Sequence, residues 1–133
     1  MTKQQKDKIK KLAQKYHLNL ILFFGSQVSK KTHFNSDTDI AFLSSKELDY
    51  KDEYDISYQI SLILKNNQID LVNLKNASPF LKKEIMSNAK ILYKKNQEIF
   101  DNYLIYSYQV FRETLPLFSL KEKAIKHFVK KYD

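Results

Sequence analysis

The sequence predicts an α/β (α+β) fold, in which a small mixed β-sheet of three to four strands is flanked by helices and followed by a long C-terminal helical segment. Three short apolar runs of β-forming residues, at 18–24, 40–43 and 68–74, predict buried strands. Between these runs, apolar residues recur at helical spacing, which indicates amphipathic helices packed on the sheet. From Lys95 onward the helical spacing continues, so the last segment is predicted to be a helix.

The N-terminal part of the chain predicts a helix followed by the first strand. Over 3–16, apolar residues lie at i, i+3, i+4 and i+7, and lysines occupy the other face. The strand 18–24 ends at Gly25, the only glycine in 133 residues. We expect this glycine where a Cβ would not fit, in a tight turn or where the backbone approaches a ligand. A short helix over 27–31 is predicted next, with its N-terminus toward that ligand.

Two aspartates, Asp37 and Asp39, lie one residue apart at the start of the run 40–43. Residues i and i+2 of a strand project from the same face, so both carboxylates are expected to point the same way. Neighbouring like charges are unfavourable unless a cation lies between them, and Mg²⁺ held by oxygen ligands meets that need. The N–H and hydroxyl groups of Gly25-Ser26 suit phosphate oxygens, so the whole pattern predicts a site for nucleotidyl transfer.

Asp70 lies inside the third apolar run, between Ile69 and Leu71, where an aspartate is disfavoured and needs a reason. One interpretation is a charge that protects a sheet edge from pairing with other chains. Because two further aspartates already indicate a metal site, we prefer the functional interpretation, in which Asp70 adds a third carboxylate.

The remaining helices and strand are predicted from the spacing of their apolar residues and from residues typical of helix ends. A helix is expected over 52–65, closed by the asparagine pair 66–67 in place of a glycine. Ser-Pro at the start of 78–88 is typical of a helix N-terminus. A short edge strand is expected over 91–93.

The length suits a single domain with one core. We expect a core over 1–95 and a helical extension over 96–133 that packs on the core. Pro116 is expected to kink or end the long helix. The segment beyond Pro116 is the better candidate for a partner surface, because it lies outside the minimal fold.

The composition limits the classes of partner that the chain is expected to bind. The net charge of +8 fits either attraction to a polyanion or acidic protein, or a lysine-rich solubilising surface, and nucleic-acid binding is not expected to be the main role. The chain has no cysteine, and no apolar run approaches the roughly 20 residues of a membrane helix. These features predict a cytoplasmic protein without a membrane role.

The spacing Gly25-Ser26-x10-Asp37-x-Asp39, with Asp70 heading a later run, resembles the signature of the DNA polymerase β-like nucleotidyltransferase superfamily. The short length makes the chain similar to its minimal nucleotidyltransferase (MNT) group. The resemblance implies a nucleotidyltransferase fold, ATP as substrate and two Mg²⁺ ions. It also implies that the three aspartates are the catalytic and metal-binding residues. The residues expected to bind the nucleotide are Gly25, Ser26, Gln27 and Lys30, with Gln27 standing where many family members have Arg.

MNT proteins of this size are similar to antitoxins paired with a HEPN-domain ribonuclease toxin. The resemblance implies transfer of AMP from ATP to a tyrosine of that toxin. One alternative is an aminoglycoside-type transferase with a small-molecule acceptor, although such enzymes usually carry an extra helical domain. Another is a non-catalytic antitoxin that blocks its toxin sterically, against which the aspartate triad argues, because unpaired buried charges are costly without a use.

Overall fold

The computed structural model describes residues 1–25 and 38–132. The short helix expected over 27–31 lies outside the described residues. In the described part, no helix is long and apolar enough to cross a membrane.

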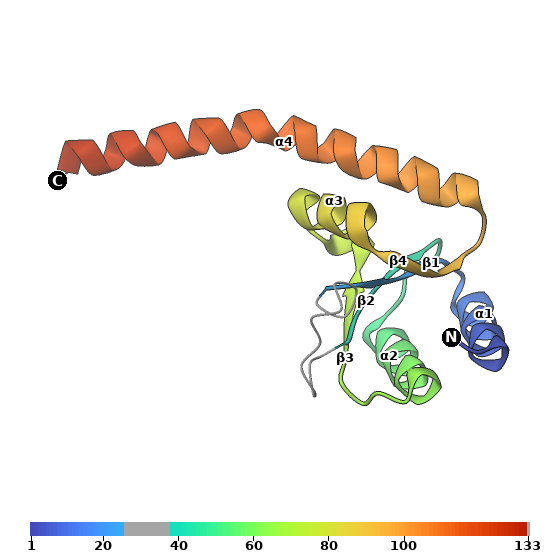
Figure 1. Ribbon diagram of the computed structural model, residues 1–133. Coiled ribbons are helices and arrows are strands. Elements are labelled where there is room, and N and C mark those ends of the chain that lie inside the picture. The colour runs from blue at the N-terminus through green and yellow to red at the C-terminus, as the bar shows by residue number, and fades with distance from the viewer. Residues whose placement is uncertain (26–37, 133) are drawn as a thin grey trace.

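A four-stranded mixed sheet forms the centre of the molecule, with strand order β3-β2-β1-β4 (Figure 1). Strand β1 (Leu18–Phe24) pairs antiparallel with β2 (Thr38–Ser44) on one side and with β4 (Lys90–Lys94) on the other. Strand β3 (Ile69–Asn73) runs parallel to β2. The predicted mixed sheet and its predicted edge strand are therefore confirmed.

Helices α1 (Lys3–Tyr16) and α2 (Tyr50–Leu64) cover one face of this sheet (Figure 1). Each begins with a capping box, from Thr2 with Gln5 and from Asp49 with Asp52, which satisfies N–H groups that a helix start leaves unpaired. Their apolar stripes pack onto the sheet in the first of two core clusters. The fully buried members of this cluster include Ile9, Ala13, Ile21, Ile40, Phe42, Ile56 and Ile60.

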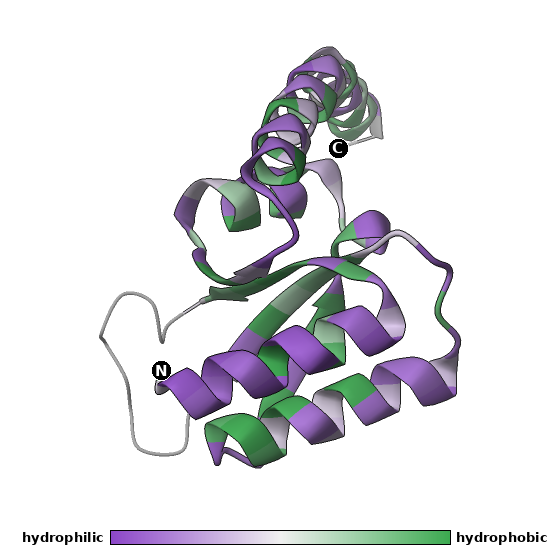
Figure 2. Cartoon of the chain, turned by 90° about the vertical axis from the view of Figure 1, so that its right-hand side faces the viewer, coloured by the Kyte–Doolittle hydropathy of each residue, from purple (hydrophilic) through white to green (hydrophobic). Residues whose placement is uncertain are grey.

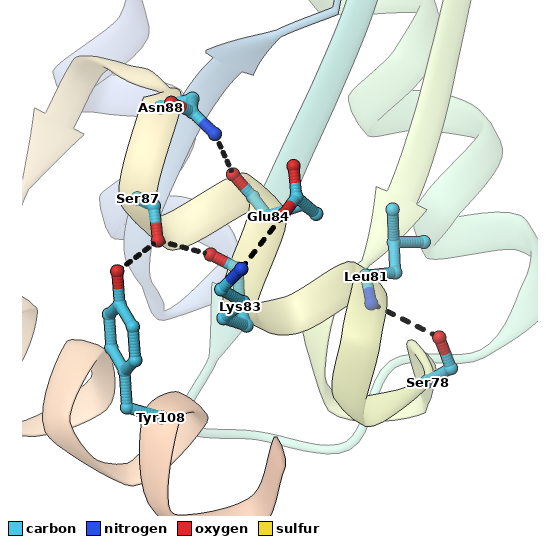
Figure 3. Close-up of polar contacts among 7 residues, drawn as sticks. All are labelled: Ser78, Leu81, Lys83, Glu84, Ser87, Asn88 and Tyr108. Atoms are coloured by element: carbon cyan, nitrogen blue, oxygen red, sulfur yellow. Dashed lines mark hydrogen bonds and ion pairs between the residues drawn. The ribbon is translucent and has the colours of Figure 1, made fainter. Parts of the chain in front are cut away.

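The opposite face is covered by a 3-10 turn, η1 (Leu74–Asn76), by helix α3 (Pro79–Asn88) and by the first part of helix α4 (Gln97–Tyr132) (Figure 1). Ser78 caps α3, as predicted, by accepting a hydrogen bond from the Leu81 N–H at 3.2 Å (Figure 3). The second core cluster lies here. It contains Leu20, Leu22, Ala41, Leu74, Ile85 and Met86, with Ile99, Phe100, Tyr103 and Leu104 of α4 packed against it.

Aromatic and polar contacts attach α4 to α3. The Tyr108 hydroxyl hydrogen-bonds the Ser87 hydroxyl at 2.7 Å (Figure 3). The rings of Phe111 and Phe80 lie 6.1 Å apart between centroids, and the Lys83 ammonium lies 5.0 Å from the Phe111 ring. These contacts fix the direction in which α4 leaves the body of the protein.

Helix α4 does not end at Pro116 but continues through it to Tyr132. Figure 1 shows that the helix bends about midway along its length and then extends well away from the sheet. A proline removes one backbone hydrogen bond and pushes against the preceding turn, which a bent helix can accommodate. Of the two outcomes expected at Pro116, a kink or a helix end, the structure shows a bend within a continuous helix.

Several other boundaries differ from the predictions by one or two residues, and those of α2 and β2 bear on the site. Helix α2 begins at Tyr50 because the Asp49 side chain caps it. It ends at Leu64, and Lys65, whose backbone is left-handed (φ 55°), supplies the C-cap that we expected from the asparagine pair 66–67. Strand β2 begins at Thr38, two residues before the apolar run 40–43, so Asp39 lies within the strand, as the expected strand geometry of the aspartates requires.

Candidate functional site

Gly25 directly follows strand β1 and has a backbone conformation that a residue with a side chain rarely adopts. Its φ is +86°, and a Cβ built on it would lie 2.0 Å from Oδ2 of Asp39 and 3.0 Å from Cγ of the same side chain. Both the backbone angle and the lack of space require glycine here. The expectation that the single glycine stands where a Cβ would not fit is therefore confirmed, and the obstructing group is one of the predicted carboxylates.

Asp39 and Asp70 lie directly opposite each other on neighbouring strands. In the parallel ladder of β2 and β3, Asp39 pairs in register with Asp70, while Phe24 of β1 pairs with Asp39 on the other side. Residues that are directly opposite in a sheet project from the same face. The fold thus brings two of the three predicted aspartates together, next to the glycine turn that follows Phe24.

The alternation of side chains shows which face carries the two carboxylates. Ala41 and Val72, each two residues beyond an aspartate, belong to the core cluster on the side of α3 and α4. Ile40 and Leu71, each one residue beyond, belong to the opposite cluster. Asp39 and Asp70 therefore lie on the sheet face that α3 and α4 cover, near the N-terminal ends of the parallel strands β2 and β3. Asp39 is half-buried and Asp70 is exposed, so the pair is open to solvent.

Asn66 bonds the N-terminal ends of β2 and β3 to each other. From the sequence alone, it was expected only to close the preceding helix. Its side-chain amide donates to the hydroxyl of buried Thr38, the residue before Asp39. Its side-chain carbonyl accepts from the Gln68 N–H at 2.9 Å, and the Gln68 carbonyl accepts from the Thr38 N–H at 2.8 Å. Asn66 thus links the N-terminal ends of β2 and β3, the ends near which Asp39 and Asp70 lie. In the sequence, this role of Asn66 was indicated only by its position in the short connection before the strand that carries Asp70.

Asp37, Ser26, Gln27 and Lys30 lie outside the described residues, so their predicted roles remain predictions. In the described ranges, 1–25 and 38–132, no group of three or more His, Cys, Asp or Glu side chains is placed to hold a metal ion. The described pair still fits a hard divalent cation chemically. Its donors are carboxylate oxygens of two adjacent like charges, a pairing that a cation between them stabilises.

The groups with shifted pKa values have structural roles. A hydrogen bond from Tyr16 to Asp55 joins α1 to α2, and this bond, with some burial, raises the pKa of Tyr16 to about 12. The same bond is the main reason why the pKa of Asp55 is lowered. Burial raises the pKa of Tyr103 to about 12, and its hydroxyl donates to the Leu74 carbonyl at 3.4 Å.

Sequence comparison gives a family match over most of the chain. The profile of the family "Polymerase beta, Nucleotidyltransferase" matches residues 7–98. A protein adenylyltransferase, MntA of Shewanella oneidensis, is 33% identical over 81 residues, which are 61% of this chain and 58% of that protein. The matched region therefore spans less than two thirds of the length of this relative.

Solved structures share the whole architecture. A crystal structure of a toxin–antitoxin with AMP-PNP has a chain that is 27% identical, with a TM-score of 0.72, covering 94% of this chain and 98% of that chain. A chain in the structure of tri-AMPylated Shewanella oneidensis HEPN toxin in complex with MNT antitoxin is 24% identical, with a TM-score of 0.67. It covers 98% of this chain and 99% of that chain, and at this identity the likeness concerns the fold alone. These matches confirm the expected fold.

Proposed function

This chain belongs to the polymerase beta nucleotidyltransferase family, whose profile matches residues 7–98, and we propose that it transfers AMP from ATP to a tyrosine hydroxyl of a HEPN-domain ribonuclease toxin. The observation that carries the proposal is the in-register pairing of Asp39 with Asp70 beside the Gly25 turn. Two carboxylates on one open face, next to a glycine whose backbone carries no side chain, are suited to position a metal-bound triphosphate.

Asp39 and Asp70 would hold Mg²⁺, together with Asp37, which the sequence spacing places in the same set. When bound, Mg²⁺ neutralises charge on the phosphate oxygens, and two ions are proposed, as in other sites of this chemistry. The backbone N–H of Gly25 and the hydroxyl of Ser26 are proposed to hold the terminal phosphates. Gln27 and Lys30 are proposed to complete the nucleotide site.

Asp70 is the exposed member of the carboxylate pair, so an incoming acceptor reaches it more easily than it reaches half-buried Asp39. We assign Asp70 to orient the acceptor hydroxyl and to accept its proton. The hydroxyl oxygen forms a bond to the α-phosphorus, and the bond from that phosphorus to the bridging oxygen breaks. Pyrophosphate leaves with that electron pair, and the products are the AMP-modified acceptor and pyrophosphate.

The choice of a protein acceptor is supported by what the relatives are. The matched protein of S. oneidensis is a protein adenylyltransferase, and a structure of the same architecture is a toxin–antitoxin with AMP-PNP. The basic composition, with a net charge of +8, suits both a nucleotide and an acidic partner surface.

One experiment tests the function and separates it from the alternatives. The purified chain is incubated with Mg²⁺, ATP labelled at the α-phosphate, a cognate HEPN toxin and, in a parallel reaction, an aminoglycoside. Label on a tyrosine of the toxin, absent when Asp39→Asn replaces the wild type, is the expected result. Label on the drug alone would favour a small-molecule transferase. A stable, unlabelled complex with the toxin would favour steric blockade, and either of these outcomes overturns the proposal.

A further inference from the structure

A groove of about 280 Å³ lies between helices α1 and α2, on the sheet face opposite to the paired aspartates. Figure 2 shows the two helices side by side, with α1 starting at the N mark and coloured mostly hydrophilic. Three lysines of α1, two apolar residues and one glutamine line the groove: Lys8, Lys11, Lys15, Leu12, Ile63 and Gln59. The groove therefore combines a basic wall with an apolar floor.

Hydrogen bonds join α1 to α2 on both sides of the groove. Toward the start of α1, the Gln5 side-chain amide donates to the Ile63 carbonyl at 3.0 Å. Toward its end, the Tyr16 hydroxyl donates to the Asp55 carboxylate. These bonds connect residues far apart in the chain and hold the two helices against each other. The groove is therefore preformed, and a ligand that enters it does not bear the cost of ordering its walls.

The three lysines form a row along α1. They stand at i, i+3 and i+7, so they share one helix face and span about 10 Å at the usual helical rise. The Lys15 ammonium lies 3.6 Å from the Asp55 carboxylate. In residues 1–25 and 38–132, neither Lys8 nor Lys11 forms an ion pair. The row thus presents positive charge to the groove that Asp55 offsets only at one end.

The surroundings of this row favour a nucleic acid over an acidic protein. Leu12 and Ile63 are only 6% and 9% exposed, so the groove offers little apolar surface for a protein partner to bury. A row of ammonium groups attracts the phosphates of a strand without needing apolar area. Packed helices lie about 8–10 Å apart, so a groove between them suits one strand and is too narrow for a duplex.

Gln59, on the α2 side of the groove, indicates which kind of strand fits. Its side-chain amide donates to Oδ1 of Asp55 at 3.5 Å, and within the described residues its side-chain carbonyl accepts no hydrogen bond. A carbonyl oxygen in this position can accept a hydrogen bond from a ribose 2′-hydroxyl, a donor that deoxyribose lacks. Lysines on one wall and this acceptor on the other therefore suit the phosphates and riboses of RNA.

We propose that the groove formed by Lys8, Lys11, Lys15 and Gln59 binds single-stranded RNA, with the lysines on phosphates and the Gln59 carbonyl on a 2′-hydroxyl. This activity goes beyond AMP transfer and does not depend on it, because the groove and the paired aspartates lie on opposite faces of the sheet. Contacts to phosphate and sugar carry no sequence information, so binding is expected to be independent of sequence.

The first test measures binding of a fluorescent oligouridylate of about twelve nucleotides to the full chain by anisotropy. We expect the wild type to bind with a Kd of about 10⁻⁵ M at physiological salt, and the logarithm of its affinity to fall with the logarithm of salt concentration with a slope of about −2, as three phosphate contacts require. Lys8→Glu/Lys11→Glu should weaken binding about tenfold or more. The matched control, Lys3→Glu/Lys10→Glu, makes the same change of net charge on the same helix at exposed positions that do not line the groove, and should bind within about threefold of the wild type.

The second test compares the oligouridylate with an oligodeoxyuridylate of the same length. We expect the wild type to prefer RNA by about fivefold, the usual size of one hydrogen bond. Gln59→Leu keeps a good helix former of similar size and removes the acceptor, so it should bind both strands about equally.

Four outcomes would overturn the proposal. The wild type does not bind the RNA, or the control loses as much affinity as Lys8→Glu/Lys11→Glu, which would show attraction by net charge alone. The wild type binds the DNA strand, or a duplex of oligouridylate with oligoadenylate, as tightly as the single RNA strand. The wild type prefers a polyglutamate peptide to the RNA, which would indicate an acidic protein as the occupant. Gln59→Leu retains the full preference for RNA. Thermal melting of each variant confirms that the fold is retained.

Discussion

Replacing Gly25 with alanine tests the link between the turn and the carboxylate beside it. The new Cβ would lie 2.0 Å from Oδ2 of Asp39, whereas ordinary van der Waals contact begins near 3.4 Å. The backbone has little freedom to relieve the clash, because Phe24 pairs with Asp39 in the sheet. The Asp39 carboxylate must therefore rotate or shift by more than an ångström.

The two consequences of this change differ in size. An alanine forced into a left-handed conformation costs about 1–2 kcal/mol of folding free energy, which a domain of ordinary stability tolerates. A displacement of about 1 Å in a group that positions reacting atoms costs about a hundredfold in rate. We therefore predict that Gly25→Ala remains folded but loses about a hundredfold in AMP transfer.

The assay measures transfer of labelled AMP and the free energy of unfolding in urea for the same preparations. Ile60→Val is the matched control, because Ile60 is fully buried in the first core cluster and its loss of one methyl group costs about 1 kcal/mol without touching the site. The reasoning is wrong if Gly25→Ala transfers AMP within about threefold of Ile60→Val at comparable stability, because a displacement of Asp39 should cost far more.

Three further predictions follow from the described contacts. Tyr16→Phe should lower the free energy of unfolding by about 1 kcal/mol in urea titrations, because it removes a partly exposed hydrogen bond to a charged group. In the wild type, the lowered pKa of Asp55 contributes stability that is lost on acidification, and the raised pKa of Tyr16, about 12, contributes stability that is lost as the pH rises from about 10 through about 12. The variant should lack the alkaline dependence and keep only the weaker acid dependence that Gln59 and Lys15 still give Asp55. Asn66→Ala should cost about 1–2 kcal/mol, because it leaves the buried Thr38 hydroxyl without its donor, and should reduce AMP transfer more than melting temperature alone explains. Millimolar Mg²⁺ should raise the melting temperature of the wild type but not of Asp39→Asn, and a rise of equal size in both would argue against a metal at this pair.

The sequence was sufficient for the elements whose apolar pattern is strong. Strand β1 has the predicted bounds, Leu18–Phe24, and helix α1 buries Ile9, Leu12 and Ala13 of the predicted stripe. The steric need for glycine at position 25 was also predictable, because a chain with a single glycine is expected to place it where a Cβ would not fit. In each case a local property of the residues decides the outcome.

The features that the sequence did not predict depend on contacts between distant segments. The sequence predicted that Asp39 and Asp70 share one site, but the exact register that places them opposite each other is set by the pairing of two strands far apart in the chain. The Asn66 side chain bonds Thr38 across 28 positions, so its residue type alone suggested only a helix end. The continuation of α4 through Pro116 shows that helical residues on both sides of a proline can outweigh its local cost.

The most direct test of the central claim is AMP transfer by Asp70→Asn compared with Asp7→Asn, a matched change at an exposed aspartate of α1 on another part of the surface. We predict that Asp70→Asn melts within about 2 °C of the wild type but transfers less than about a thousandth as much AMP to the toxin, while Asp7→Asn is fully active. Transfer by Asp70→Asn at a rate close to that of Asp7→Asn would contradict the assignment of the paired aspartates as the catalytic site.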